Sequence, residues 1–284
     1  MNINWYPGHM AKAKKLIQEN LKMVDMIIEI RDARIPLSSA NPDFEKLIAG
    51  KTRVIALNKA DLAEPSATEA WIKWFQSNGI NAMPINSLDF KNAEKMKSFI
   101  LKIAEEKARE ILDKKGIRKT VRGMVIGIPN VGKSTFINSI AGGKKAKTGN
   151  KPGVTKGKQW IKISSYMDLL DTPGLLWPKI HDQNVALHLA YTKTIKEEIL
   201  DPEEIAHYFL EEMKRLCPDA IDQRYEVEVL AEKKGYEILE SICLKKGWIK
   251  SGGIPDTVRG ARHVLDDFQM GRLGRITLEW PEEV

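Results

Sequence analysis

Short apolar runs alternate with amphipathic stretches along the first part of the chain. The apolar runs have the length of buried strands and lie at residues 24–30, 54–57, 80–85, 124–126 and 166–170. Between them, apolar positions recur at helical spacing over residues 6–20, 91–115 and a stretch opened by Pro65 and Ser66. Strands that alternate with helices form a mainly parallel sheet, with binding loops at the carboxyl ends of the strands. We therefore expect an α/β domain.

The pattern changes after Trp177. Strand-like runs disappear, and helical spacing recurs at residues 182–199, 202–216, 223–234, 236–246 and 256–270. The sequence thus predicts two domains. The first is an α/β domain over residues 1–177, and the second is a smaller all-helical domain over residues 178–284.

Three aromatic residues lie in the helical stretch that follows Pro65. Trp71, Trp74 and Phe75 are at helical spacing next to predicted strands. This placement favours packing in the core over a platform on which nucleic-acid bases stack.

A glycine-rich segment follows the predicted strand 124–126. Residues 127–134 read GIPNVGKS, which matches the phosphate-loop pattern between a strand and a helix. Gly127 and Gly132 allow the backbone N–H groups to surround phosphate oxygens at a helix N-terminus. Lys133 is expected to reach the β- and γ-phosphates, and the Ser134 hydroxyl to bind magnesium. The segment predicts a nucleoside-triphosphate site.

A second motif supplies specificity for the base. Residues 58–61 read NKAD after the apolar run 54–57. An ionised Asp61 only accepts hydrogen bonds, so it suits the N1–H and N2 donors of guanine, whereas adenine would leave the carboxylate unpaired. Asn58 is expected to hold the loop, and the Lys59 stem to lie over the ring. Asn86 and Ser87, after the run 80–85, are candidates for a loop that supports the guanine, with an ordinary turn as the alternative.

The metal-binding end of the site is expected after the run 166–170. Residues 171–174 read DTPG, in which Asp171 would hold magnesium through water and the Gly174 N–H would sense the γ-phosphate. Thr155, in the preceding PGVT segment, is the candidate for the last protein ligand of the metal. These residues predict a complete GTP site that needs Mg²⁺.

The order of the motifs is unusual, because the guanine loop precedes the phosphate loop. The chain also opens with WYPGHM at residues 5–10 and carries DARIP at residues 32–36. With these motifs the chain resembles the circularly permuted GTPases, most closely the ribosome biogenesis GTPase A (YlqF) family. The resemblance is specific over about the first 180 residues. It implies a GTPase that acts in late assembly of the large ribosomal subunit and is stimulated by that particle.

The predicted contacts with GTP or GDP come from the guanine loop, its supporting loop, the phosphate loop and the switch glycine. They are Asn58, Lys59, Ala60, Asp61, Asn86, Ser87, Asn130, Val131, Gly132, Lys133, Ser134, Thr135 and Gly174.

Catalysis departs from the commonest GTPase pattern. Many GTPases place a glutamine after DxxG to orient the attacking water, but this chain has Leu175. His9 is our candidate for that role, since imidazole both donates and accepts hydrogen bonds near neutral pH; a structural or surface histidine is the alternative. The predicted catalytic set is His9, Lys133 and Thr155. Asn130 resembles the asparagine that binds K⁺ in cation-dependent GTPases, so K⁺ is a candidate second cofactor.

Composition agrees with a ribosomal partner. The 284 residues carry a formal net charge of +7, which suits RNA although it also aids solubility. One predicted RNA surface is the switch loop, which is the loop between the phosphate loop and the run 166–170 that carries Thr155; it is represented by Lys144, Lys145 and Lys147. A second is the last helix with Arg259 and Arg262. A solvated basic face is the alternative for both. Two cysteines without metal-like spacing and the absence of a signal peptide or membrane-length run indicate the cytoplasm, with no membrane partner.

The sequence therefore predicts a GTPase that binds pre-ribosomal large subunits in its GTP state and leaves on hydrolysis, slow alone and monomeric off the ribosome. Two alternatives remain open: a GTPase of translation or RNA modification, and a nucleotide-binding module without turnover. A small-molecule kinase is disfavoured, because the guanine loop would serve no purpose there.

Overall fold

The computed structural model describes residues 8–143, 159–177, 180–195, 200–229 and 231–283, with side chains described from Ala13 onward except at Gln159 and Glu283. Two compact units divide the chain. The α/β unit comprises residues 3–179 together with 279–284, and the helical unit comprises residues 180–278 with the first two residues.

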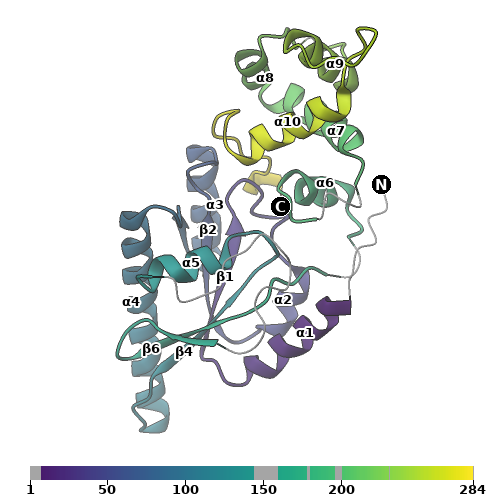
Figure 1. Cartoon of the computed structure of the whole chain (residues 1–284). Helices are drawn as coiled ribbons and strands as arrows, with labels where there is room; N and C mark the ends of the chain where they lie inside the picture. Colours follow the sequence, from purple (N-terminus) through teal and green to yellow (C-terminus); the bar gives the residue numbers. More distant parts are fainter. Residues whose placement is uncertain (1–7, 144–158, 178–179, 196–199, 230, 284) are drawn as a thin grey trace. The chain divides into compact units, whose positions relative to one another are not determined.

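A six-stranded sheet forms the centre of the α/β unit (Figure 1). Its strands are β1 (Met26–Asp32), β2 (Thr52–Asn58), β3 (Asn81–Ile85), β4 (Val121–Ile126), β5 (Gln159–Lys162) and β6 (Met167–Asp171). Their order is β3-β2-β1-β4-β6-β5, and all neighbours are parallel except β5, which pairs antiparallel with β6 at the edge. The predicted mainly parallel α/β fold is confirmed.

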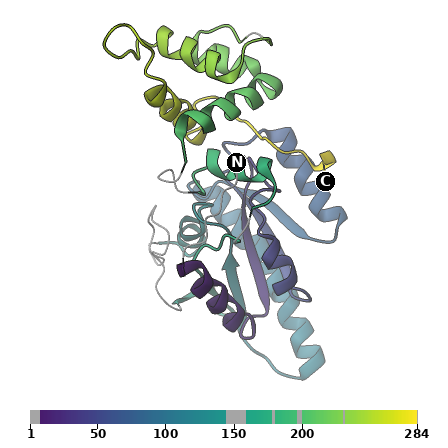
Figure 2. The ribbon, with the colours of Figure 1, turned by 90° about the vertical axis from the view of Figure 1, so that its right-hand side faces the viewer.

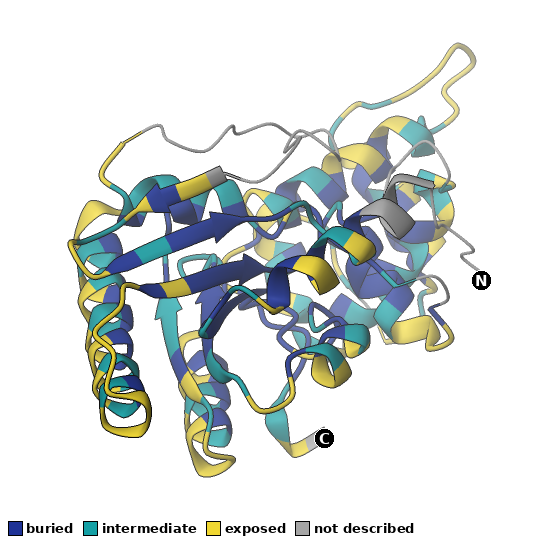
Figure 3. Cartoon of the chain, turned by 90° about the horizontal axis from the view of Figure 1, so that it is seen from below, coloured by how far each residue is buried: buried dark blue, intermediate teal, exposed yellow. Residues whose placement is uncertain are grey.

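Helices cover both faces of this sheet. They are α1 (Gly8–Leu21), α2 (Pro42–Leu47), α3 (Pro65–Ser77), α4 (Phe90–Lys115) and α5 (Lys133–Ile140). Figure 1 shows α1 and α2 on one side of the strands, and α4 and α5 on the other. The chain first adds β2 and β3 on one side of β1 and then adds β4 and β6 on its other side. Because crossovers between parallel strands are right-handed, the connecting helices lie on one face of the sheet for the first direction and on the opposite face for the second. Figure 3 shows the strands buried between the helices, whose outer faces are exposed.

The aromatic residues of α3 lie in the core, as the sequence predicted. Trp71 and Phe75 are each 1% exposed and pack with Ile55 and Leu57 of β2, while Trp74 is partly buried against them. This helix is therefore fixed to the strand that ends in the guanine-loop motif.

The helical unit is built around α7 (Pro202–Leu216), which contacts all the other helices described for it. These are α6 (Gln183–Tyr191), α8 (Pro218–Tyr225), α9 (Gly235–Lys245) and α10 (Thr257–Gln269). Two expected helices differ. The stretch 223–234 is wrong as a helix, because α8 begins at Pro218 and Glu226 takes the left-handed conformation with φ of 58°. The helix expected over 182–199 ends at Tyr191.

The last residues of the chain return to the α/β unit, which differs from the expected second domain of 178–284. Residues 281–283 form a short 3₁₀ helix beside α3 (Figure 2). The Trp71 indole N–H donates to the Glu279 carbonyl oxygen at 2.8 Å. The Glu279 carboxylate accepts hydrogen bonds from the backbone N–H groups of Leu37 and Ser38 at 2.6 and 3.0 Å. The helical unit is thus joined to the α/β unit at both of its ends.

Within the described residues, no helix combines the length and the apolar character that crossing a bilayer requires.

Candidate nucleotide site

The loop between β4 and α5 has the backbone that a phosphate loop needs. Gly132 has φ of 97°, and a Cβ at this position would lie 2.4 Å from the Asn58 amide nitrogen. Gly127 has φ of 154°, and a Cβ there would lie 2.7 Å from the Ile30 carbonyl oxygen. Both positions therefore require glycine, because any side chain would collide and strain the backbone. The loop leads directly into α5, whose N-terminus faces it.

Lys133 is the first residue of α5 and is buried, with 8% of its surface exposed. Its ammonium group donates to the Ile128 carbonyl oxygen at 2.7 Å, within the phosphate loop itself. Burial lowers the pKa of Lys133 to about 8, although the Asp171 carboxylate opposes the shift. A buried cation of this kind is stabilised by a phosphate group, which supplies the missing negative charge.

The guanine-loop and phosphate-loop motifs meet through Asn58. Its side-chain N–H group donates to the Val131 carbonyl oxygen at 2.9 Å, across 73 residues of sequence. Its Oδ1 accepts hydrogen bonds from the Ser87 hydroxyl at 2.7 Å and from the Ser87 N–H at 3.3 Å. One amide therefore joins three of the predicted loops. Asn86 has a more local contact, since its Oδ1 accepts from the Leu88 N–H at 2.9 Å.

Lys59 belongs to an ion cluster that the sequence analysis did not assign. Its Nζ lies 2.9 Å from Asp32 Oδ2, which also accepts from Arg34 Nη2 at 2.9 Å. Asp32 and Arg34 are almost fully buried. Burial alone would raise the pKa of Asp32, but the charges of Arg34 and Lys59 outweigh it and hold the pKa well below its usual range. The cluster fixes Lys59 beside the loop that would receive the base.

Parallel pairing explains this cluster. Asp32 ends β1 directly opposite Asn58 at the end of β2, so the next residue, Lys59, lies beside the Asp32 carboxylate. Lys59 takes a left-handed backbone with φ of 60°. The Ala60 N–H then donates to the Ile85 carbonyl oxygen at 3.2 Å, and Asp61 is half-buried. The DARIP segment was noted in the sequence, but nothing in the pattern showed that its acid would pair with the guanine-loop lysine.

The DTPG segment lies against the phosphate loop. Asp171 ends β6 and is buried, and the Thr172 hydroxyl donates to the Val125 carbonyl oxygen at 2.6 Å. A Cβ on Gly174 would lie 2.9 Å from both Lys133 Nζ and the backbone of Pro129. The Leu175 N–H donates to the Gly127 carbonyl oxygen at 3.2 Å. Glycine at 174 is therefore what lets this switch segment approach Lys133.

The oxygen donors at this end of the site fit Mg²⁺. Ser134 supplies a half-buried hydroxyl on the first turn of α5, and Asp171 supplies a buried carboxylate at the carboxyl end of a nearby strand. Hydroxyl and carboxylate oxygens are the ligands that this hard cation prefers. When bound, the ion would neutralise charge on the phosphates of the nucleotide.

Several predicted residues are not among those brought together here. Thr155 and the switch-loop lysines Lys144, Lys145 and Lys147 lie outside the described residues, as does the side chain of His9, whose backbone is in the first turn of α1. Asn130 is exposed, with φ of 59°, and Thr135 is half-buried on α5. Arg259 and Arg262 lie on α10 in the helical unit and are exposed.

A guanine loop, a phosphate loop and a DxxG segment meet at the carboxyl ends of parallel strands, and the guanine loop comes first in the chain. This arrangement defines a circularly permuted P-loop GTPase. A family model described as "50S ribosome-binding GTPase" matches residues 122–228. The Ribosome biogenesis GTPase A of Bacillus cereus is 42% identical over 284 residues, covering 100% of this chain and 95% of the relative. The chain belongs to the ribosome biogenesis GTPase A family.

Two comparisons with Thermotoga maritima extend this result. Its Ribosome biogenesis GTPase A is 30% identical, with 99% of this chain and 96% of the relative covered. The crystal structure of GNP-bound YlqF from this organism has a TM-score of 0.65 at 26% identity and covers 96% of this chain and 100% of that one. The resemblance drawn from the motifs is thus confirmed over the whole chain.

Proposed function

We propose that this GTPase is an assembly factor of the large ribosomal subunit. In its GTP state it binds the pre-ribosomal particle, and hydrolysis to GDP releases it. The cycle takes place in the cytoplasm, and off the ribosome the protein is a monomer. The names of the relatives support a role in ribosome biogenesis.

The observation that carries the release step is the covalent position of the helical unit. The DTPG segment at residues 171–174 senses the γ-phosphate, and the helical unit begins at Ile180, a few residues later. At its other end, Glu279 is fixed to the loop of Leu37 and Ser38. The same loop region carries Asn41, whose amide donates to the Leu175 carbonyl oxygen at 2.9 Å. The switch segment is therefore joined to one end of the helical unit along the chain, and it is linked to the other end through the loop of residues 37–41.

The chemistry is positioning and charge neutralisation. Lys133 contacts the phosphates, Ser134 and Thr155 bind Mg²⁺ directly, Asp171 binds it through water, and the Gly174 N–H contacts the γ-phosphate. Asp61 reads the guanine edge.

The group that orients the attacking water comes from elsewhere, because Leu175 is fully buried and apolar. We assign this role to His9, which the ribosomal particle would bring to the γ-phosphate. A K⁺ ion bound by Asn130 supplies further positive charge. RNA contact is assigned to Lys144, Lys145 and Lys147 and to Arg259 and Arg262.

Cosedimentation with purified particles tests this function. In the presence of a non-hydrolysable GTP analogue, the protein should sediment with immature large subunits more than with mature ones, and GDP should release it. Equal binding to mature ribosomes in both nucleotide states would favour a translation GTPase. Nucleotide binding without phosphate release on any particle would favour a module without turnover.

A further inference from the structure

A ring stack connects α10 to the segment that follows α9. The rings of Trp248 and His263 lie 4.5 Å apart between centroids at an interplanar angle of 19°. The backbone fixes Trp248, because its N–H donates to the Cys243 carbonyl oxygen at 2.8 Å and its carbonyl oxygen accepts from the Asp256 N–H at 2.8 Å. His263 is exposed, so the stack presents a firmly held aromatic surface to solvent.

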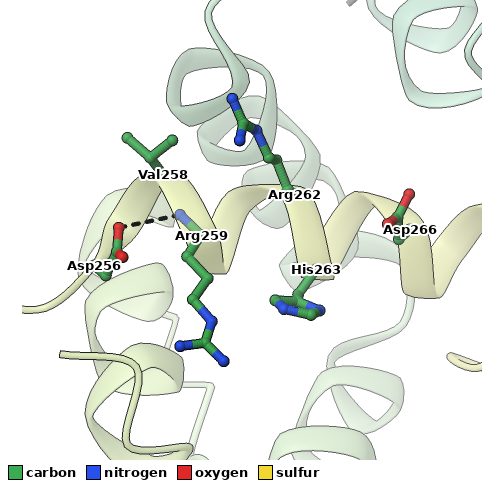
Figure 4. Close-up of a pocket in the computed structure, with 6 residues that line it drawn as sticks. All are labelled: Asp256, Val258, Arg259, Arg262, His263 and Asp266. Atoms are coloured by element: carbon green, nitrogen blue, oxygen red, sulfur yellow. Dashed lines mark hydrogen bonds between the residues drawn. The ribbon is translucent and has the colours of Figure 1, made fainter.

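A shallow cavity of about 300 Å³ lies along α10 beside this stack (Figure 4). Its lining residues are Asp256, Val258, Arg259, Arg262, His263 and Asp266. Figure 4 shows Arg259 and His263 pointing to one side of the helix and Arg262 to the other. The two guanidinium groups therefore lie on opposite sides of the helix and do not converge on a single point.

The acidic residues of this cavity are already engaged. Asp256 caps α10 by accepting from the Arg259 N–H, and its carboxylate lies 3.6 Å from Lys250 Nζ. Asp266 accepts from Lys193 Nζ at 2.6 Å.

Arg259 and Arg262, by contrast, form no ion pair with any residue that the structure describes. The Arg259 guanidinium lies 5.9 Å from the centre of the Trp248 ring. The cavity therefore has two available cations beside an aromatic surface, which favours an anionic ligand with a flat ring.

We propose that this cavity binds one unstacked nucleotide of single-stranded RNA. The base stacks on His263, which Trp248 supports from behind, and Arg259 and Arg262 contact the phosphates on its two sides. Aromatic stacking combined with guanidinium contacts is how proteins bind unpaired nucleotides. A duplex cannot offer a free base face to this surface. The inference rests on the proposed function and narrows it, since it places an unpaired segment of ribosomal RNA at α10.

The test measures binding of a fluorescent hexa-adenylate RNA to the full-length protein by anisotropy. His263→Ala should weaken binding by roughly 5- to 150-fold, the loss expected for one stacked base. His263→Phe should keep most of the affinity, because it retains the ring. Arg259→Ala and Arg262→Ala should each reduce the slope of log K against log salt by about 0.7, as one lost single-strand phosphate contact predicts.

His181→Ala and Arg215→Ala are matched controls, because both residues are exposed in the helical unit and lie outside the cavity. They should bind like the wild type. Equal losses in His263→Ala and His263→Phe, or an unchanged salt slope in both arginine variants, would overturn the proposal. Displacement of the RNA by hexaglutamate at equal concentration would also overturn it and indicate a site for acidic peptides.

Phosphate release in the presence of large subunits, measured on the same variants, distinguishes a failure of this proposal from a failure of the proposed assembly function. A wild type that is stimulated by the particle yet does not bind hexa-adenylate contradicts the nucleotide site alone. A wild type that binds the RNA as described but is not stimulated contradicts the assembly function alone.

Discussion

The side-chain amide of Asn58 donates to the Val131 carbonyl oxygen at 2.9 Å, and this bond joins the guanine loop to the phosphate loop. The two residues are 73 positions apart, in the reverse of the usual GTPase order. Because the two loops lie next to each other in the fold, this bond does not depend on which loop comes first in the chain. The same amide accepts from Ser87 and so also fixes the supporting loop.

Asn58→Ala should therefore weaken GTP and GDP binding by a similar factor. The change leaves the Ser87 hydroxyl and the Val131 carbonyl without this partner, which costs about 1–3 kcal/mol. Calorimetric titration of both nucleotides measures the effect. Asn78→Ala is the control, because Asn78 is exposed, lies outside the predicted site, and its side-chain amide donates only to the Trp74 carbonyl oxygen of its own helix. Equal losses in the two variants would show that Asn58 does not couple the loops.

Asp61→Asn should change the preferred nucleotide from GTP toward xanthosine triphosphate. The substitution replaces an acceptor with a donor at the guanine edge, and a mispaired buried group costs about 1–3 kcal/mol. Competition binding with GTP and XTP measures the preference. If the variant binds both with the affinities of the wild type, Asp61 does not read the base.

GDP affinity should fall as the pH rises above about 8. The pKa of Lys133 in the nucleotide-free protein is about 8, lowered from 10.5 by burial. Phosphate stabilises the charged form, so binding takes up a proton once the free protein has lost it, and affinity decreases by up to about tenfold per pH unit. The folding stability of the nucleotide-free protein changes with pH in the opposite direction to the GDP affinity. Between pH 8 and 10.5 the unfolded chain holds more protons at this residue, so the nucleotide-free fold gains stability.

Titrations of GDP from pH 7 to 9.5 check this dependence. Lys133→Arg keeps its charge throughout this range, so the decrease that belongs to Lys133 should be absent from it, while any titration of guanine remains in both proteins. Parallel pH profiles for the two proteins would contradict the assignment.

Glu279→Gln should destabilise the α/β unit. The carboxylate accepts from the Leu37 and Ser38 N–H groups and from the Ser38 hydroxyl, and an amide at this position offers one acceptor oxygen instead of two. We expect a loss of about 1–3 kcal/mol in the free energy of unfolding. Denaturant unfolding measures it, with the exposed Glu282→Gln as the control. A difference of less than a few tenths of a kcal/mol between the two variants would show that the tail contributes little.

Much of the fold was predictable because the strands are buried parallel strands, which read as continuous apolar runs. The edge strand β5 was missed, since its four residues contain only two adjacent apolar positions, Trp160 and Ile161, flanked by Gln159 and Lys162, which is too short a run to indicate a strand. The helix α2 was missed because it has only six residues. In the helical unit, Pro218 at the first turn of α8 was the available signal for the start of that helix. The apolar spacing over residues 223–234 instead led to a helix being expected further along the chain.

The nucleotide site was predictable motif by motif, because each loop carries its own chemistry. The contacts between loops were not, since the pairing of Asp32 with Lys59 depends on the register of two strands. The return of Glu279 to Trp71 depends on tertiary packing over 208 residues and has no local signature.

Single-turnover GTP hydrolysis with and without isolated large subunits tests the central claim most directly. The protein should hydrolyse GTP slowly alone and much faster with saturating large subunits, while small subunits at the same concentration should have no effect. Lys133→Ala should show no hydrolysis under either condition, which excludes a contaminating GTPase in the particles. Equal rates for the wild type with and without large subunits would contradict the account.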